Sequence, residues 1–273
     1  MEKKLIVIDM DGTLLIDANR IGDFSVSTLR SLSKAGHYVV LASGRPYRAM
    51  KRYYDLLGLT GPIICYNGAL VFNPHSSEPP MVDRKFDQAV LKDIAIKAPY
   101  VTSFMAEDLE DVYVSRIDRY LSQFFHYEGM GVHVGPISQI LNKDTYTALF
   151  RCVHKHDQEL AELAREYPGI ELRHWTNSLY SELAFIGTDK GSAVKRIQEL
   201  TGISKENTIA FGDADNDMTM LMQAGLPFAM KGCKSTALTS AFPSTKKSNA
   251  EDGVARMLAE LLPDVADVDN IVE

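Results

Sequence analysis

Short apolar runs rich in β-branched residues alternate with helical stretches, and this rhythm constrains the fold more than any other feature. Leu5–Ile8 is the first such run, and it stops at Asp9. The same pattern predicts strands at 38–42 and 62–66 and helices at 25–35 and 46–57. Strands that alternate with helices are typical of a parallel sheet covered by helices, so we expect an α/β fold.

The rhythm breaks at Asn73–Pro80, a stretch rich in proline and serine. Residues 83–187 then mix helical stretches with alternating ones, which predicts an α+β unit. The α/β rhythm resumes after Gly187. We therefore expect one α/β domain made of residues 1–82 and 188–273, interrupted by an inserted domain at 83–187.

Further elements follow from the same patterns. Residues 69–72 are predicted to return as the second strand of a hairpin after the turn at Asn67-Gly68. The other predicted helices cover 87–97, 157–167, 190–200, 217–224 and 251–262, and the other predicted strands cover 111–115, 145–152, 208–211 and 228–230. The acidic stretch after Pro263 is expected to be a solvated end.

Composition excludes several classes of protein. The chain has 273 residues, 45% of them hydrophobic and 24% charged, and a formal net charge of −7. These values fit a folded soluble protein and disfavour non-specific binding of nucleic acid, which needs clustered positive charge. Three scattered cysteines indicate neither a disulfide framework nor a structural zinc site, so we expect a cytoplasmic protein. No run approaches the length of a signal-peptide core or a membrane span.

Polar and acidic clusters follow three of the predicted strands. They are Asp9-Met10-Asp11-Gly12-Thr13, Ser43-Gly44-Arg45 and Gly212-Asp213-Ala214-Asp215-Asn216-Asp217. Ligands of an open parallel sheet bind outside the carboxyl ends of its strands. The three clusters are therefore expected to converge on one site.

Asp9 and Asp11 allow two interpretations. The first interpretation is that the D-x-D-G segment only forms a turn with a helix cap. Alternatively, two close carboxylates repel unless a cation or proton lies between them, and Mg²⁺ bound by oxygen ligands would serve. An EF-hand is rejected for both acidic clusters, because the required glycine and glutamate positions hold other residues.

Ser43 and Lys190 are open to two interpretations as well. Ser43-Gly44 precedes a predicted helix, which suits either an N-cap serine or a phosphate oxygen bound by free N–H groups. Lys190 opens another helix, so it is either a surface charge or a contact to a bound anion.

Taken together, these motifs resemble those of the haloacid dehalogenase (HAD) phosphatase superfamily. The resemblance rests on Asp9-Met-Asp11-Gly-Thr-Leu, Ser43-Gly-Arg45, Lys190-Gly191 and Gly212-Asp213-Ala-Asp-Asn216-Asp217, in this order. Three further segments, at 64–69, 224–230 and 249–254, resemble the Cof-type branch of the superfamily. The insert resembles the subclass IIB cap of that branch, and the rest would then be a Rossmann-like HAD core.

This resemblance implies a Mg²⁺-dependent phosphatase that works through an aspartyl-phosphate. Asp9 would be the nucleophile, and Asp11 would protonate the leaving oxygen and later deprotonate water. Mg²⁺ would bind Asp9, the backbone carbonyl of Asp11 and Asp213. Asp217 would orient Lys190 or a metal-bound water.

The phosphoryl oxygens would be bound by side chains and by backbone N–H groups. Ser43, Lys190 and Asn216 would supply side chains, and Met10 and Gly44 would supply N–H groups. The role of Arg45 stays open between an ion pair and a phosphate contact. Lys231-Gly232-Cys233 departs from the usual Cof-type pattern, and we interpret the change as structurally neutral rather than as a determinant of specificity.

The cap is expected to choose the substrate. The acidic run Glu107–Asp111 is interpreted as a solvated face, although it could instead repel acidic substrates. His154, His156 and His174 are assigned surface or core roles, because their spacing matches no metal site. Trp175, Tyr180 and Phe185 are candidates for packing the cap against the core.

The expected substrate is a small phosphorylated metabolite, either a sugar phosphate or a cofactor or nucleotide phosphate. A phosphomutase or phosphotransferase on the same core is one alternative, and a non-catalytic protein that binds phosphorylated ligands is another. No nucleic-acid or membrane partner is expected, and the oligomeric state stays open. The acidity lies outside the catalytic core: residues 1–82 and 188–256 carry 18 basic and 15 acidic residues, against 11 and 16 in the cap.

Overall fold

The computed structural model describes residues 2–17, 19–175 and 178–264 of the chain. These residues form two compact units. Of the described residues, the first unit comprises 2–17, 19–44, 50–82 and 189–264, and the second comprises 45–49, 83–175 and 178–188. Beyond Asp264, the predicted acidic tail lies outside the described residues.

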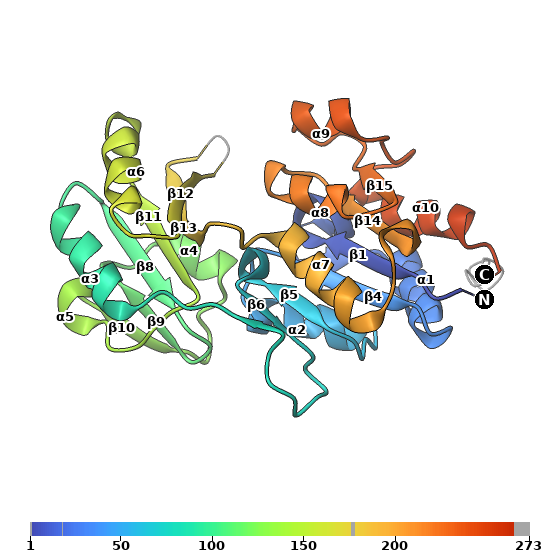
Figure 1. Cartoon of the computed structure of the whole chain (residues 1–273), viewed down its shortest axis with the longest axis horizontal. Helices are drawn as coiled ribbons and strands as arrows, with labels where there is room; N and C mark the ends of the chain where they lie inside the picture. Colours follow the sequence, from blue (N-terminus) through green and yellow to red (C-terminus); the bar gives the residue numbers. More distant parts are fainter. Residues whose placement is uncertain (1, 18, 176–177, 265–273) are drawn as a thin grey trace. The chain divides into compact units, whose positions relative to one another are not determined.

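The first unit, here called the core unit, is built on a seven-stranded sheet in the order β15-β14-β1-β4-β5-β6-β7 (Figure 1). Its strands are β1 (Leu5–Asp9), β4 (Tyr38–Ala42), β5 (Ile63–Cys65), β6 (Leu70–Phe72), β7 (Val82–Asp83), β14 (Thr208–Gly212) and β15 (Leu226–Ala229). The five strands from β15 to β5 are parallel, and β6 turns back antiparallel to β5. The predicted α/β class and the predicted hairpin are therefore confirmed.

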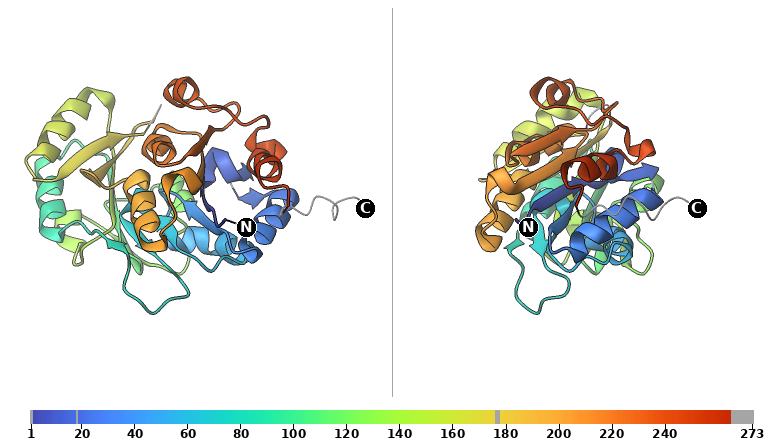
Figure 2. Two further views of the ribbon diagram at one scale, coloured as in Figure 1. Left: turned by 45° about the vertical axis from the view of Figure 1, so that its right-hand side comes forward. Right: turned by 90° about the vertical axis from the view of Figure 1, so that its right-hand side faces the viewer.

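Helices lie on both faces of this sheet (Figure 2). They are α1 (Asp23–Lys34), α2 (Tyr47–Leu56), α7 (Lys190–Thr201), α8 (Met218–Met222), α9 (Thr236–Ala241) and α10 (Gly253–Leu261). Leu5 and Val7 of β1 pack in one cluster with Val194 and Ile197 of α7. All five residues of β1 are buried, as expected for a parallel strand covered on both faces. A small hairpin of β2 (Leu15–Asp17) and β3 (Arg20–Ile21) follows β1.

The predicted boundaries are correct to within a few residues, and the differences have local causes. The helix predicted from Asp217 starts as a 3₁₀ turn at Asp215–Asp217 and becomes α8 only at Met218. The last helix starts at Gly253 rather than Glu251, because Asp252 adopts a left-handed conformation with a φ of 58°. Such a residue cannot continue an α-helix.

The second unit, here called the cap unit, contains a six-stranded sheet in the order β10-β9-β8-β11-β13-β12. Its strands are β8 (Ser103–Glu107), β9 (Asp111–Val114), β10 (Gly131–Val134), β11 (Thr147–Arg151), β12 (Ile170–His174) and β13 (Tyr180–Phe185). Its helices are α3 (Gln88–Lys97), α4 (Arg119–Phe124), α5 (Ile137–Ile140) and α6 (Asp157–Arg165). The mixed composition agrees with the predicted α+β character.

The two faces of the cap sheet have separate apolar clusters. Phe104 and Ala106 of β8 pack in a cluster with residues of α3, α5 and α6. Met105, between them, packs in the other cluster with Leu121 of α4. Successive side chains of a strand point to opposite faces, so α4 lies on the face opposite the other three helices.

The chain's C-terminal part is tied back to α1 by a side-chain cap. Helix α1 has Gly22 at its N-cap position, which offers no side chain. Asp252 supplies the missing acceptor: its Oδ1 accepts from the backbone N–H of Ser25 at 3.2 Å and from the Ser25 hydroxyl at 2.6 Å. This contact gives the segment at 249–254 a structural role.

We predict that Asp252→Ala lowers the free energy of unfolding of the core unit by about 1–2 kcal/mol, because α1 loses its cap. Asp252→Asn is the matched control, since asparagine keeps an acceptor oxygen and tolerates a positive φ. Urea unfolding followed by circular dichroism measures both. Equal midpoints for the two variants would contradict the capping role.

Candidate active site

Three neighbouring strands of the core sheet bring the predicted site residues to one edge. Asp9 is the last residue of β1, Ser43 directly follows β4, and Asp213 directly follows β14. Since β14, β1 and β4 are adjacent and parallel, their carboxyl ends meet at the same edge.

The loop after β1 is shaped by a glycine. Gly12 has a φ of 81°, and a Cβ atom built there would lie 2.3 Å from Oδ2 of Asp213. Only glycine allows the two loops to approach this closely. The hydroxyl of Thr13 donates to Oδ1 of Asp213 at 3.3 Å. The segment from Asp9 to Thr13 is therefore more than a turn, because it packs directly on the loop after β14.

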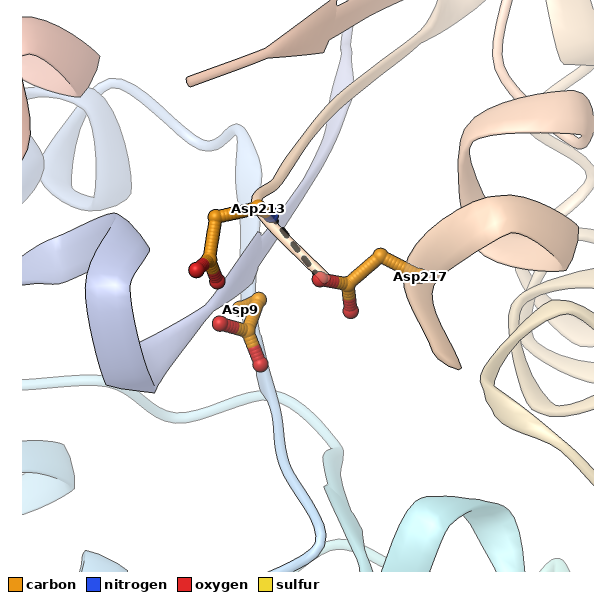
Figure 3. A group of neighbouring side chains, drawn as sticks. All are labelled: Asp9, Asp213 and Asp217. Carbon is orange, nitrogen blue, oxygen red and sulfur yellow. Dashed lines mark hydrogen bonds between the residues drawn. The ribbon is translucent and has the colours of Figure 1, made fainter. Parts of the chain in front are cut away.

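Three carboxyl groups cluster at this edge (Figure 3). Oxygen atoms of Asp9, Asp213 and Asp217 all lie within 4.8 Å of one another. Asp217 uses both of its oxygens within the protein. Its Oδ2 accepts from the backbone N–H groups of Asp213 at 3.0 Å and Ala214 at 3.1 Å, and its Oδ1 accepts from Lys190. Asp9 and Asp213 are therefore the better candidates for metal ligands.

Lys190 lies inside this cluster. Its Nζ donates to Oδ1 of Asp9 at 2.5 Å and to Oδ1 of Asp217 at 2.6 Å, and its side chain is 1% exposed. It is the first residue of α7, and Asp189 and Ser192 fix that helix start with a capping box. The interpretation of Lys190 as a surface charge is therefore wrong.

Burial and mutual repulsion shift the protonation of these groups. Burial, together with the charge of Asp217, raises the pKa of Asp9 well above its usual value. The same two causes raise the pKa of Asp213 to about 6. Burial alone would lower the pKa of Lys190, but the carboxylates of Asp217 and Asp9 raise it instead. The cluster therefore holds three carboxyl groups and one ammonium group, so it lacks positive charge.

This shortage makes the site fit a hard divalent cation. Asp9 and Asp213 offer carboxylate oxygens, which are the donors that Mg²⁺ prefers. Half-buried Asp11, two residues after Asp9, adds a further negative charge that also raises the pKa of Asp9. The donor set contains no sulfur or imidazole, which a softer metal would favour.

The loop after β4 contacts the loop at Asn67, which lies in the segment at 64–69 that resembles the Cof-type branch but to which the sequence assigned no site role. The backbone N–H of Asn67 donates to the carbonyl of buried Ser43 at 3.0 Å, and a Cβ atom on Gly44 would lie 3.0 Å from Nδ2 of Asn67. The Asn216 amide donates to Oδ1 of Asn67 at 3.0 Å. Asn67 therefore connects the loops that carry Ser43, Gly44 and Asn216.

Asn67 has two signals in the sequence, a predicted turn and the resemblance of 64–69 to the Cof-type branch, and the backbone conformation adds a third. Tyr66 and Asn67 have φ values of 50° and 52°, a left-handed conformation that is uncommon outside glycine. Asparagine tolerates it better than most residues. Strained backbone often marks a functional site, so the Asn-Gly pair after a buried strand was a usable sign.

Three positions singled out in the sequence remain: Met10, Arg45 and Lys231. Met10 is fully buried, as expected for a residue that contributes its backbone. Arg45 is 3% exposed, and its guanidinium carbon lies 5.4 Å from the ring centroid of Phe124. The backbone N–H of Lys231 donates to the hydroxyl of Thr245 at 2.9 Å, and the Lys231 side chain is exposed.

The acidic run of the cap differs in part from the expected solvated face. Glu107 is fully buried and pairs with Arg48 at 2.5 Å, so that expectation is wrong for this residue. Asp108, Glu110 and Asp111 also form an acidic group, but Lys143 pairs with all three. This lysine offsets part of their negative charge, and an acidic group on the surface is by itself no evidence for a metal site.

The cap histidines have ordinary partners. His154 pairs with Asp157 and His156 with Glu159, each at 2.9 Å. His174 contacts the hydroxyl of Ser181 at 2.8 Å. These contacts agree with surface roles.

Comparison with known proteins agrees with the fold and the motifs. Residues 6–258 match the model of the haloacid dehalogenase-like hydrolase family. A 5-amino-6-(5-phospho-D-ribitylamino)uracil phosphatase of Bacillus subtilis is 34% identical over 271 residues, covering 95% of this chain and 98% of the relative. A pyridoxal phosphate phosphatase of Escherichia coli is 26% identical, covering 94% of this chain and 98% of the relative.

Solved structures agree as well. A Thermotoga maritima protein of known structure has a TM-score of 0.79 at 27% identity, covering 95% of this chain and 97% of its own. A HAD subclass IIB sugar phosphatase shares the fold, with a TM-score of 0.78 at 20% identity, covering 95% of this chain and 99% of its own. The chain therefore belongs to the haloacid dehalogenase-like hydrolases, and it is a phosphatase of that superfamily.

Among residues 2–17, 19–175 and 178–264, no helix has the length and apolar character needed to cross a membrane.

We predict that Mg²⁺ stabilises the protein more at about pH 8 than at about pH 5. The pKa of Asp213 is raised to about 6 without a cation, so its ionisation destabilises the fold as the pH rises through that value. A bound cation relieves this repulsion. We therefore expect Mg²⁺ to raise the free energy of unfolding at the higher pH by about 2 kcal/mol. Melting temperatures with and without Mg²⁺ at both pH values measure it.

Asp213→Asn is the control for this prediction. The variant removes one charge of the cluster, so its melting temperature without Mg²⁺ should rise at the higher pH and respond little to added Mg²⁺. Equal stabilisation of the unaltered protein by Mg²⁺ at both pH values would argue against a cation at this site.

Proposed function

We propose that this phosphatase is Mg²⁺-dependent and hydrolyses small phosphorylated metabolites through an aspartyl-phosphate on Asp9. The observation that carries the proposal is the buried contact of Asp9 with Lys190, beside Asp213, at the carboxyl edge of the sheet. A carboxylate there can act as a nucleophile towards phosphorus.

Two steps would complete the reaction. A carboxylate oxygen of Asp9 attacks phosphorus, the bond from phosphorus to the alcohol oxygen breaks, and Asp11 donates a proton to that oxygen. Asp11 then takes a proton from water, which attacks the phosphorus of the aspartyl-phosphate. Inorganic phosphate leaves and the Asp9 carboxylate is restored.

Asp9, Asp213 and the backbone carbonyl of Asp11 would hold Mg²⁺. When bound, the cation supplies positive charge that offsets the repulsion between an anionic carboxylate and an anionic phosphate. Lys190 adds a fixed positive charge to the same place, and Asp217 orients it through the contact at 2.6 Å.

The phosphoryl oxygens would be bound by groups from three loops. Lys190, Ser43 and Asn216 contribute side chains, and the backbone N–H groups of Met10 and Gly44 contribute the rest. Asn67 would position this set, since it contacts the loops of both Ser43 and Asn216.

We also propose that 1–82 with 188–273 carries the chemistry and that 83–187 selects the substrate. The relatives' names give the first compounds to test, a phosphorylated ribitylaminouracil and pyridoxal phosphate. A cytoplasmic location is part of the proposal, since all three cysteines are free thiols, as in a reducing compartment.

We predict that Asp9→Asn and Asp9→Ala lower kcat by about 10³-fold or more, because no other group replaces the nucleophile. Asp215→Asn is a matched control. Asp215 lies three residues after the end of β14, it is exposed, and it accepts a hydrogen bond from the Ser235 hydroxyl. Release of inorganic phosphate from pyridoxal phosphate with Mg²⁺ is the measurement.

Hydrolysis retained by either Asp9 variant would refute the aspartyl-phosphate. Product analysis in the same assay separates the alternatives. An isomerised ester without free phosphate would identify a phosphotransferase, and binding without any turnover would identify a non-catalytic protein.

A further inference from the structure

The core unit has a cavity that the proposed function does not use. Its volume is about 310 Å³, at the small end of the range usual for ligand pockets. Its lining comes from α1, from α10 and from the two lysines that precede α10, Lys246 and Lys247. None of its lining residues belongs to the group of carboxylates at the edge of the sheet, so the cavity is a separate feature.

Basic residues outnumber acidic ones in the lining of this cavity. Lys246, Lys247 and Arg256 line it, against one acid, Glu260. Lys246 pairs with Glu260 at 2.6 Å, but both side chains are largely exposed, and such a pair contributes little stability. Within the described part of the chain, Arg256 has no carboxylate partner, and its Nε donates to the backbone carbonyl of Glu251 at 2.9 Å. These cations are therefore available to an anionic ligand.

The cavity also has apolar lining residues, which are Phe24, Met257 and Ala259. Phe24 is half-buried, and the guanidinium carbon of Arg256 lies 5.1 Å from the centroid of its ring. The aromatic ring and the cation are thus side by side. A ligand that joins an acidic group to an apolar ring can contact both at once.

The segment that carries the two lysines is fixed by its neighbours. The backbone carbonyl of Lys247 accepts from the hydroxyl of buried Thr245 at 2.7 Å. A Cβ atom on Gly253 would collide with that same carbonyl oxygen, so only glycine lets α10 begin this close to Lys247. The cavity is therefore already formed, and a ligand would lose little affinity to ordering it.

The cavity is connected to the loop that carries Asp9. Lys247 pairs with Glu251 at 2.8 Å, and Glu251 ends the short turn Asn249–Glu251. At the start of that turn, Nδ2 of Asn249 donates to the backbone carbonyl of Leu15 at 2.7 Å. Leu15 directly follows the segment Met10–Leu14. All of these contacts lie within the core unit.

We propose that this cavity binds a small organic anion, an acidic group attached to an apolar ring, and that its occupancy stabilises the loop after β1. Lys246, Lys247 and Arg256 bind the acidic group, and Phe24 contacts the ring. The ligand is an effector rather than a substrate, because its site and the site of Asp9 are distinct. The inference goes beyond the proposed function and does not depend on which residue is the nucleophile.

The binding test uses 1-naphthoate as the probe, followed by titration calorimetry on the full-length protein. We expect saturable binding at one site. The uncharged analogue 1-naphthamide, and acetate, which has no ring, should each bind at least about 10-fold more weakly. Absence of saturable binding of 1-naphthoate, or equal affinity for 1-naphthamide, would overturn the proposal.

Variants locate the bound probe. Arg256→Gln should weaken the binding of 1-naphthoate by about 10-fold, because a charge-assisted contact is lost, and Phe24→Leu tests the ring independently. Arg196→Gln is the matched control, since Arg196 is an exposed arginine of α7 outside the lining. Circular dichroism checks that each variant is folded. Unchanged affinity in both Arg256→Gln and Phe24→Leu would overturn the proposal.

Competition separates the cavity from the site of Asp9. Inorganic phosphate with Mg²⁺ should not displace 1-naphthoate, and Asp9→Asn should bind the probe with unchanged affinity. Displacement by phosphate would place the probe at the carboxyl edge of the sheet and overturn the proposal. Retained hydrolysis by Asp9→Asn would refute the proposed function alone.

Hydrogen exchange tests the connection to the loop after β1. Bound 1-naphthoate should slow amide exchange at residues 10–15 by about 5-fold. Asn249→Ala should bind the probe but lose this slowing, because the contact with Leu15 is removed. Unchanged exchange at 10–15 in the unaltered protein, with the probe bound, would overturn the proposed effect on the loop.

Discussion

The site depends on one buried ammonium group placed among carboxylates. Lys190 donates to Asp9 at 2.5 Å and to Asp217 at 2.6 Å, and water is nearly excluded from all three side chains. An unpaired charge there would be costly, so the pairing constrains everything around it. It requires that α7 start at Lys190 and that β1 and β14 end beside it. Even so, Asp9 and Asp213 keep raised pKa values, which is the physical reason to expect a further cation.

The sheet provides this arrangement by its strand order. Because β14, β1 and β4 are adjacent and parallel, loops separated by long stretches of chain end at one edge. Gly12 then lets the loop after β1 approach Asp213, and Asn67 joins the loops of Ser43 and Asn216. The rigid part of the site is therefore made by backbone geometry. The charged groups at this edge come from a small number of side chains, among them Asp9, Lys190 and Asp213.

The cap uses its two sheet faces differently. Three helices cover one face with a closed apolar cluster, while α4 covers part of the other and leaves aromatic rings exposed. A protein that needed only stability would gain by burying those rings.

The sequence by itself determined the α/β class, the inserted cap and the motif residues, because apolar periodicity and turn residues are local properties. It could not decide which polar residues are buried. Lys190 and Glu107 each looked compatible with a solvated position, yet both are buried against partners far away in the chain. Nor could it show that Asn67 joins two loops or that Tyr120 and Trp175 share one surface with Tyr180. Those contacts arise only when strands and helices pack, since burial and pairing depend on residues that are distant in sequence.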